Sequence, residues 1–198
     1  MMKRLIPVFA LALVLTACAS APPVPEDQFY RLKAVLPSKP AAKPLFPGTI
    51  EVDRFVADGL TAGRPIVYSE AGKPYQVKEF HYHFWTQPPT VMLRDELVSY
   101  LRQAKVSSTV VTPEMRVPPD FVLTGKIKRL EKITGASPKA VLELELGLRK
   151  ATGGKLIFLD TYQIESPSDG SGVDDAVKSL NKSLSAIYDQ FVADLSKL

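Results

Sequence analysis

Residues 141–149, with the sequence VLELELGLR, decide the fold because apolar and polar side chains alternate along them. Leucine stands at positions 142, 144, 146 and 148, whereas Glu143, Glu145 and Arg149 stand at odd positions. Successive side chains of a β-strand point to opposite faces of a sheet. The pattern therefore predicts a strand with one face buried in the core and the other face in water.

Two more alternating runs, at residues 121–130 and 155–164, flank this strand, whose full run covers residues 140–150. Residues 152–154 (TGG) separate the last two runs, and glycines readily adopt the positive φ angles of a tight hairpin turn. The three runs therefore predict an antiparallel meander.

The first half of the chain contains shorter strand candidates separated by proline and glycine. Residues 64–68 and 75–85 flank a glycine-bearing turn at residues 70–73, which favours a hairpin. Further strands are predicted at residues 29–35, 50–56 and 106–112.

Two segments have the apolar spacing of amphipathic helices. Residues 90–104 follow two prolines that suit a helix start, and residues 173–198 contain a longer apolar stripe. The order of strands and helices predicts an α+β fold. We expect one domain at residues 29–198, in which a mainly antiparallel sheet carries both helices on one face.

The chain begins with the features of an export signal. Lys3 and Arg4 precede an apolar segment at residues 5–15 that is short for a membrane span. The next residues, LTAC at 15–18, resemble the lipobox of bacterial lipoproteins, in which the cysteine is acylated and becomes the new N-terminus.

Lipidation is accordingly predicted at Cys18, with a signal peptide at residues 1–17 and a proline-containing tether at residues 18–28. The alternative is an ordinary signal-peptidase site, because Ala17-Cys18-Ala19 has the A-x-A form. Acylation is favoured because Cys18 is the only cysteine of the chain, and an unpaired thiol in an exported protein needs an explanation.

Charge and cysteine content exclude several functional classes. Removal of Lys3 and Arg4 takes the 25 basic residues to 23, against 21 acidic residues, so there is no electrostatic case for nucleic-acid binding. The single cysteine excludes an internal disulfide and a cysteine metal site. No cofactor is expected.

Two groups of polar residues are candidate catalytic or metal sites. Glu79, His81 and His83 share a predicted strand face, but Glu79 and His83 would lie about 13 Å apart, too far to bind one ion. Only His81 and His83 could chelate together, and they would need further ligands from elsewhere in the chain. Glu143 and Glu145 would be about 7 Å apart and are better explained by a solvated face. No nucleophile, zinc or phosphate-loop motif occurs, and we expect neither a metal site nor a catalytic site.

Aromatic side chains mark the most informative surface. Phe80, Tyr82 and Phe84 are predicted on one face of the 75–85 strand, with further bulky residues on the other, so the strand is either buried on both faces or meets a partner. Aromatic residues and arginine often dominate protein interfaces. The residues predicted to bind a partner protein are Arg64, Tyr68, Tyr75, Tyr82 and Trp85.

The order of these features resembles the ABC-type transport auxiliary lipoprotein components, also called the PqiC-like lipoproteins. The resemblance covers almost all of the mature chain. It rests on the lipobox, residues 29–32 (FYRL) and 64–68 (RPIVY), and the aromatic pair Phe84-Trp85 followed by Pro88-Pro89. The leucine-spaced helix, the glycine turn at 153–155 and the closing helix complete it.

The resemblance implies a non-catalytic lipoprotein of the outer membrane, facing the periplasm. Its partners would be an ABC transporter and a periplasmic MCE-type subunit that move lipids between the inner and outer membranes, and homo-oligomers are possible. Ala19 after the acylated cysteine implies delivery to the outer membrane. The alternatives are a lipoprotein that binds a lipid or another apolar ligand itself, between sheet and helices, and a structural envelope lipoprotein without a transport role.

Overall fold

The computed structural model describes residues 24–198. The predicted signal peptide, Cys18 and the first part of the tether therefore lie outside the described residues. Within this range there are nine strands, two α-helices and two short 3-10 helices: β1 Gln28–Tyr30, β2 Phe46–Val52, β3 Val56–Ala57, η1 Gly59–Ala62, β4 Pro65–Glu70, β5 Lys73–Trp85, α2 Pro89–Ala104, β6 Ser107–Val111, η2 Pro113–Met115, β7 Phe121–Thr134, β8 Lys139–Lys150, β9 Leu156–Pro167 and α3 Val173–Leu195.

The meander predicted around residues 141–149 is confirmed. β8 pairs antiparallel with β7 on one side and with β9 on the other. The side chains of Leu142, Leu144, Leu146 and Leu148 are fully buried, as the alternation predicts. The opposite face is less exposed than expected, because Val141 is also fully buried and Glu143 is half-buried.

The sheet is mixed rather than mainly antiparallel. β4 and β5 form the predicted antiparallel hairpin, but β4 pairs parallel with β7. β2 also pairs parallel with β7 and with β6, and β1 pairs parallel with β5. Strands that are distant in the sequence thus lie side by side, and alternation within one strand carries no information on the direction of its neighbour. The α+β class is confirmed.

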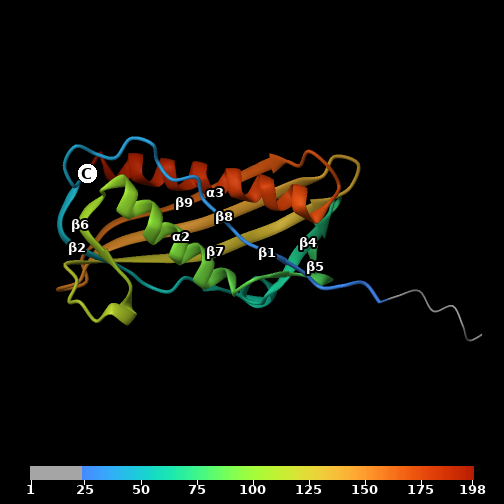
Figure 1. Ribbon diagram of the computed structural model, residues 1–198, viewed down its shortest axis with the longest axis horizontal. Helices are drawn as coiled ribbons and strands as arrows, with labels where there is room; N and C mark the ends of the chain where they lie inside the picture. Colours follow the sequence, from blue (N-terminus) through green and yellow to red (C-terminus); the bar gives the residue numbers. More distant parts are fainter. Residues whose placement is uncertain (1–23) are drawn as a thin grey trace, which may run out of the picture.

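Both helices cover one face of the curled sheet, α3 over the meander and α2 near β6 and β2 (Figure 1). The predicted apolar stripe of α2 is confirmed, since Leu93, Leu97 and Leu101 are fully buried. Pro88 precedes α2 and Pro89 opens it, as predicted. Phe191 of α3 packs in the core against aromatic rings of β9.

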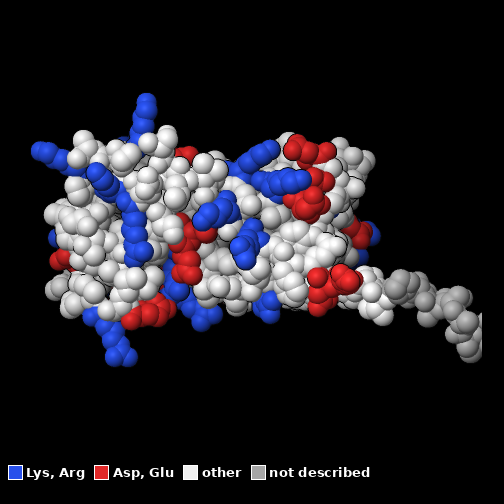
Figure 2. Space-filling model, in the orientation of Figure 1, with Lys and Arg blue, Asp and Glu red and all other residues white. Residues whose placement is uncertain are grey.

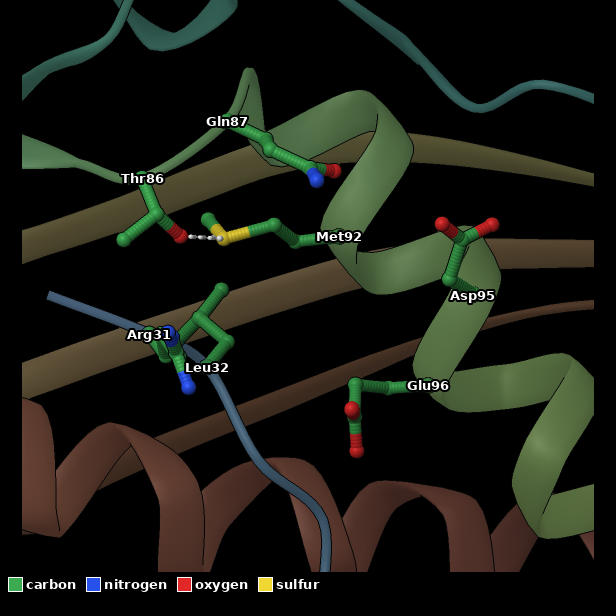
Figure 3. Close-up of a pocket in the computed structure, with 7 residues that line it drawn as sticks. All are labelled: Arg31, Leu32, Thr86, Gln87, Met92, Asp95 and Glu96. Carbon is green, nitrogen blue, oxygen red and sulfur yellow. Dashed lines mark hydrogen bonds between the residues drawn. The ribbon is translucent and has the colours of Figure 1, made fainter.

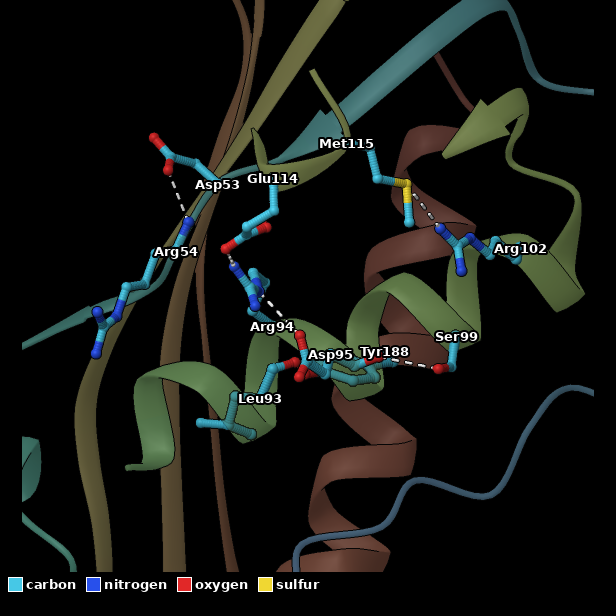
Figure 4. Close-up of polar contacts among 10 residues, drawn as sticks. All are labelled: Asp53, Arg54, Leu93, Arg94, Asp95, Ser99, Arg102, Glu114, Met115 and Tyr188. Carbon is cyan, nitrogen blue, oxygen red and sulfur yellow. Dashed lines mark hydrogen bonds and ion pairs between the residues drawn. The ribbon is translucent and has the colours of Figure 1, made fainter. Parts of the chain in front are cut away.

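Polar side-chain contacts join α2 to β6 and to η2, which follows β6 (Figure 4). The buried Arg94 side chain pairs with Glu114 of η2 through Nη1 at 2.7 Å, and with Asp95 through Nε at 2.9 Å. Arg102 donates two hydrogen bonds to the Val110 carbonyl oxygen of β6. Arg94 therefore joins α2 to η2, and Arg102 joins α2 to β6.

The predicted strand at residues 29–35 is wrong beyond Tyr30. Leu32 and Ala34 are buried, as their alternation suggested, but the segment lies across the helices instead of entering the sheet (Figure 1). The backbone N–H of Lys33 donates to Asn181 of α3 and that of Ala34 to Glu96 of α2, at 2.9 and 3.0 Å. Helix side chains therefore take the place of a neighbouring strand.

Candidate partner-binding surface

The β4–β5 hairpin carries the predicted partner-binding residues and contains a large bulge. Pro65 pairs with Phe84 and Val67 pairs with Glu79. One residue of β4, Ile66, is therefore opposite the four residues 80–83 of β5. Such a bulge bends a strand and redirects its side chains. The predicted regular alternation of residues 80–84 is consequently wrong.

The bulge assembles a row of four aromatic rings that crosses three strands. Tyr68 of β4 packs on Phe80 with ring centroids 4.4 Å apart, and Phe80 contacts His83 at 5.3 Å. The Tyr30 hydroxyl of β1 lies 2.9 Å from Nδ1 of His83. Partial burial, followed by the nearby Lys132 ammonium, lowers the pKa of His83 below its usual value, which favours the neutral ring.

Arg64 lies at the end of this hairpin, beside β1. Its Nε donates to the Trp85 carbonyl oxygen at 3.1 Å, and its guanidinium carbon lies 5.6 Å from the centre of the Phe29 ring. Phe29, which is 55% exposed, also contacts Phe84 at 5.8 Å between centroids. Sequence analysis missed Phe29 as a surface residue, because its partners come from β5 and are distant in sequence.

The remaining predicted residues differ in their exposure. Tyr75 is 99% exposed near the hairpin turn, and Tyr82 is 37% exposed within the bulge. Trp85 is 1% exposed and belongs to the core, so the inclusion of its side chain in a binding surface is wrong. The sequence could not distinguish the buried Trp85 from the exposed tyrosines. Burial of Trp85 depends on tertiary contacts at the end of β5, where Tyr30 of β1 pairs with it.

One edge of β5 is open over most of its length. On the side away from β4, β1 pairs only with His83, Phe84 and Trp85 among the described residues. The edge from Lys73 to Tyr82 therefore presents backbone N–H and C=O groups without a neighbouring strand. An open edge can accept a further strand from a partner.

The polar residues that were candidates for a metal or catalytic site do not come together around one point. Among the described residues, no group of three histidine, cysteine, aspartate or glutamate side chains is placed to hold a metal ion. His83 instead contacts Tyr30, and Glu143 pairs with Lys128 at 3.2 Å. His83 and Glu143 therefore make contacts within the fold.

One cavity lies beside the start of α2, and another lies at the hairpin turns. The first, of about 320 Å³, lies between residues 31–32 and the start of α2 (Figure 3). The carboxylates of Asp95 and Glu96 and the Met92 side chain line it, and Thr86 Oγ1 contacts the Met92 sulfur at 3.6 Å. The second, of about 560 Å³, lies between the β4–β5 and β7–β8 turns and has a more apolar lining.

Two general properties of the surface bear on function. On the face shown in Figure 2, basic and acidic side chains are intermixed, with no continuous basic stripe. Over residues 24–198, no helix combines the length and the apolar character needed to cross a bilayer.

Comparison with known proteins gives one family and a shared fold. The family model described as ABC-type transport auxiliary lipoprotein component matches residues 30–192. Protein XCC0632 from Xanthomonas campestris superposes with a TM-score of 0.73 at 19% identity, over 83% of this chain and 92% of that one. An uncharacterized protein gives a TM-score of 0.68 at 17% identity, over 86% and 99%. At these identities the structures show the fold alone, and no curated protein matches the chain.

Proposed function

Since the chain belongs to the ABC-type transport auxiliary lipoprotein component family, we propose that it is the non-catalytic, membrane-anchored component of a transport system that moves lipids between the inner and outer membranes. The matched residues 30–192 include nearly the whole folded domain. In this proposal Cys18 carries the acyl anchor, and Ala19 directs the protein to the outer membrane. The transport ATPase, elsewhere in the system, supplies the energy.

We propose further that the domain docks a periplasmic MCE-type subunit through the open edge of β5. This edge is the observation that carries the proposal, because added strands obtain affinity from backbone hydrogen bonds and specificity from side chains beside the edge. Pro74 lacks an N–H group, and register shifts between Lys73 and Val77 and at residues 80–83 interrupt the pairing with β4, so the regular part of the edge is residues 77–79. A short docking strand fits this interval.

The exposed side chains around the edge supply the specificity of this proposal. Tyr75 and Tyr82 offer aromatic area on either side of the interval, and Arg64 with Phe29 extends this surface along β1. Tyr68 is half-buried against Phe80 and contributes mainly by holding the aromatic row in place. Trp85 supports the surface from the core.

The alternative of an apolar ligand between sheet and helices finds less support. Leucines of β8 and the apolar stripes of α2 and α3 fill that layer with fully buried side chains. A structural envelope lipoprotein without a transport role remains the third possibility, which the following experiment separates from docking.

The test is binding of the purified MCE-type subunit to the mature protein and to the Tyr75→Ala and Tyr82→Ala variants. Each substitution should weaken binding by about 1–3 kcal/mol while the melting temperature changes little, because neither side chain belongs to the hydrophobic core. Leu159→Ala is the matched control, since Leu159 is 55% exposed on the distant edge strand β9. Equal binding by wild type and both tyrosine variants, with weaker binding by the control, would move the interface to β9.

Membrane fractionation tests the anchor separately. Cys18→Ser should leave the protein unprocessed or release it from the membrane. A variant that is processed and fractionates like the wild type would refute the acylation of Cys18.

A further inference from the structure

The cavity between the β4–β5 and β7–β8 turns has a structural origin that can be traced to the sheet. The parallel pairing of β4 with β7 ends at Glu70 and Thr134, and the Ala71 N–H donates to the Thr134 carbonyl oxygen at 2.8 Å. The two turns therefore leave the sheet side by side. A Cβ at Gly135 would lie 2.9 Å from the Ala71 Cβ, so this close approach requires glycine.

The walls of the cavity are apolar and its floor is a row across three strands. Ser69 of β4, Ile133 of β7 and Lys139 of β8 are neighbours in register. Ala71, Pro74 and Ala136 add apolar side chains to the lining of the cavity. The volume of about 560 Å³ is in the range of sites for small organic ligands.

The rim of the cavity is cationic. Arg129 lies on the same face of β7 as Ile133, and Lys139 pairs with Glu165 at 2.6 Å. Arg129 contacts the buried Glu131 through Nε and Nη2. Each carboxylate thus already has a basic partner, whereas the Lys139 ammonium and the Arg129 guanidinium have more N–H groups than these contacts use.

The one carboxylate in the lining, Glu70, is neutralised by two lysines. Hydrogen bonds from Lys73 and Lys78, at 2.8 and 2.5 Å, lower the pKa of Glu70 to about 2. Among the lining residues themselves, the cationic groups of Arg129 and Lys139 outnumber the single carboxylate of Glu70. The excess charge favours an anionic group at the rim.

We propose that this cavity binds an anionic amphiphile with a single acyl chain, with the chain over Ile133 and the anionic head beside Lys139 and Arg129. The described chain begins at Val24, at the end of the molecule that carries both turns (Figure 1). The six residues from 18 to 23 span about 20 Å when extended. Acylation of Cys18 would thus hold the cavity close to a bilayer, a source of such amphiphiles.

Calorimetric titration of dodecanoate, below its micelle concentration, into the mature chain carrying Cys18→Ser tests the proposal. One saturable site is expected. Affinity should rise roughly threefold to fourfold for each methylene from octanoate to dodecanoate, because each chain carbon leaves water. Acetate should not bind, and dodecanol should bind about fivefold more weakly than dodecanoate. Equal binding of dodecanol and dodecanoate would overturn the role of the cationic rim.

Variants locate the site. Ala136→Trp fills the cavity and should abolish binding, whereas Ala42→Trp, in an exposed loop beside the C-terminal end of α2, should not. Lys139→Gln removes a partly exposed ion pair and should weaken binding about fivefold, whereas Lys155→Gln in the β8–β9 turn should have no effect. Wild-type binding by Ala136→Trp would refute the assignment.

A spin-labelled dodecanoate gives a measurement that does not depend on a variant. The amide resonances of Ala71 and Ala136 should broaden, and those of residues 156–159 should not. Broadening spread over both ends of the molecule would show surface adsorption and overturn the proposal. Since partner binding at the β5 edge is measured with a different ligand and different variants, either proposal can fail alone.

Discussion

The hydroxyl of Tyr188 in α3 donates a 2.7 Å hydrogen bond to the backbone carbonyl oxygen of Leu93 in α2 (Figure 4). Both side chains are fully buried, and burial holds the pKa of Tyr188 well above its usual value. About two turns further along α2, the Tyr100 hydroxyl donates to Asp189 of α3. The two helices are therefore joined by polar contacts as well as by their common packing on the sheet.

Tyr188→Phe should lower the free energy of unfolding by about 1 kcal/mol, because it removes one buried hydrogen bond and keeps the ring. Tyr188→Ala should cost about 3–5 kcal/mol, because it also leaves a cavity. Urea unfolding followed by circular dichroism measures both values. Equal stability of the wild type and Tyr188→Phe would show that the hydrogen bond contributes nothing to folding.

Phe191→Asp should unfold the domain. Phe191 is fully buried between α3 and β9, and an unpaired carboxylate there costs several kcal/mol against a total stability of roughly 5–15 kcal/mol. The adjacent Gln190 is exposed, and Gln190→Asp is the matched control with little expected effect. A thermal melt of Phe191→Asp that overlays the wild-type melt would contradict the burial of this helix face.

Gly125→Ala should destabilise the protein by about 1–3 kcal/mol. An added Cβ would lie 2.5 Å from ring atoms of the buried Phe55, which must move inside a packed core. In the next strand, an added Cβ at Gly147 would meet the Leu159 side chain at 3.2 Å, and Leu159 can move because it is exposed. Gly147→Ala should therefore cost less, and a reversed order of the two denaturation midpoints would refute the close contact at Phe55.

Acid should weaken the contact between η2 and α2. A hydrogen bond from the Thr112 side chain, followed by the Arg94 guanidinium, lowers the pKa of Glu114 to about 2. A depressed carboxyl pKa stabilises the folded state above the unfolded pKa of about 4.5, and this contribution is lost as the pH falls towards 2.

Glu114→Gln should consequently be less stable than the wild type at pH 7 and should approach it as the pH falls from 4.5 towards 2. Urea midpoints measured across this interval test the prediction. A gap between the two proteins that stays constant with pH would show that the charge of Glu114 does not contribute.

Local patterns in the sequence predicted most of the elements but not their neighbours. The alternation at residues 141–149 identified β8 and its buried leucines, because side-chain direction in a strand has a fixed period of two. The same rule failed at residues 80–84, where the bulge opposite Ile66 brings Phe80 to His83. It also failed after Tyr30, where buried Leu32 and Ala34 face helices instead of a strand.

The surface that we propose for partner binding could be described only in part from the sequence. The aromatic composition of residues 75–85 drew attention to the β4–β5 hairpin, on which Tyr75 is exposed. Sequence could not show that Trp85 is in the core, that Phe29 joins the surface, or that the edge of β5 is open. Each of these depends on β1, which approaches β5 from more than fifty residues away in the chain.

The sequence by itself determined the α+β class, the meander and both amphipathic helices, because these follow from spacing along a short stretch of chain, whereas acylation of Cys18 stays a prediction. Only the tertiary structure decided the mixed strand directions, the open edge of β5 and the cavity beside Lys139. Parallel pairing of β4 with β7 joins segments about sixty residues apart, and their turns then lie side by side. Such pairings depend on packing of the whole chain, which local periodicity does not encode.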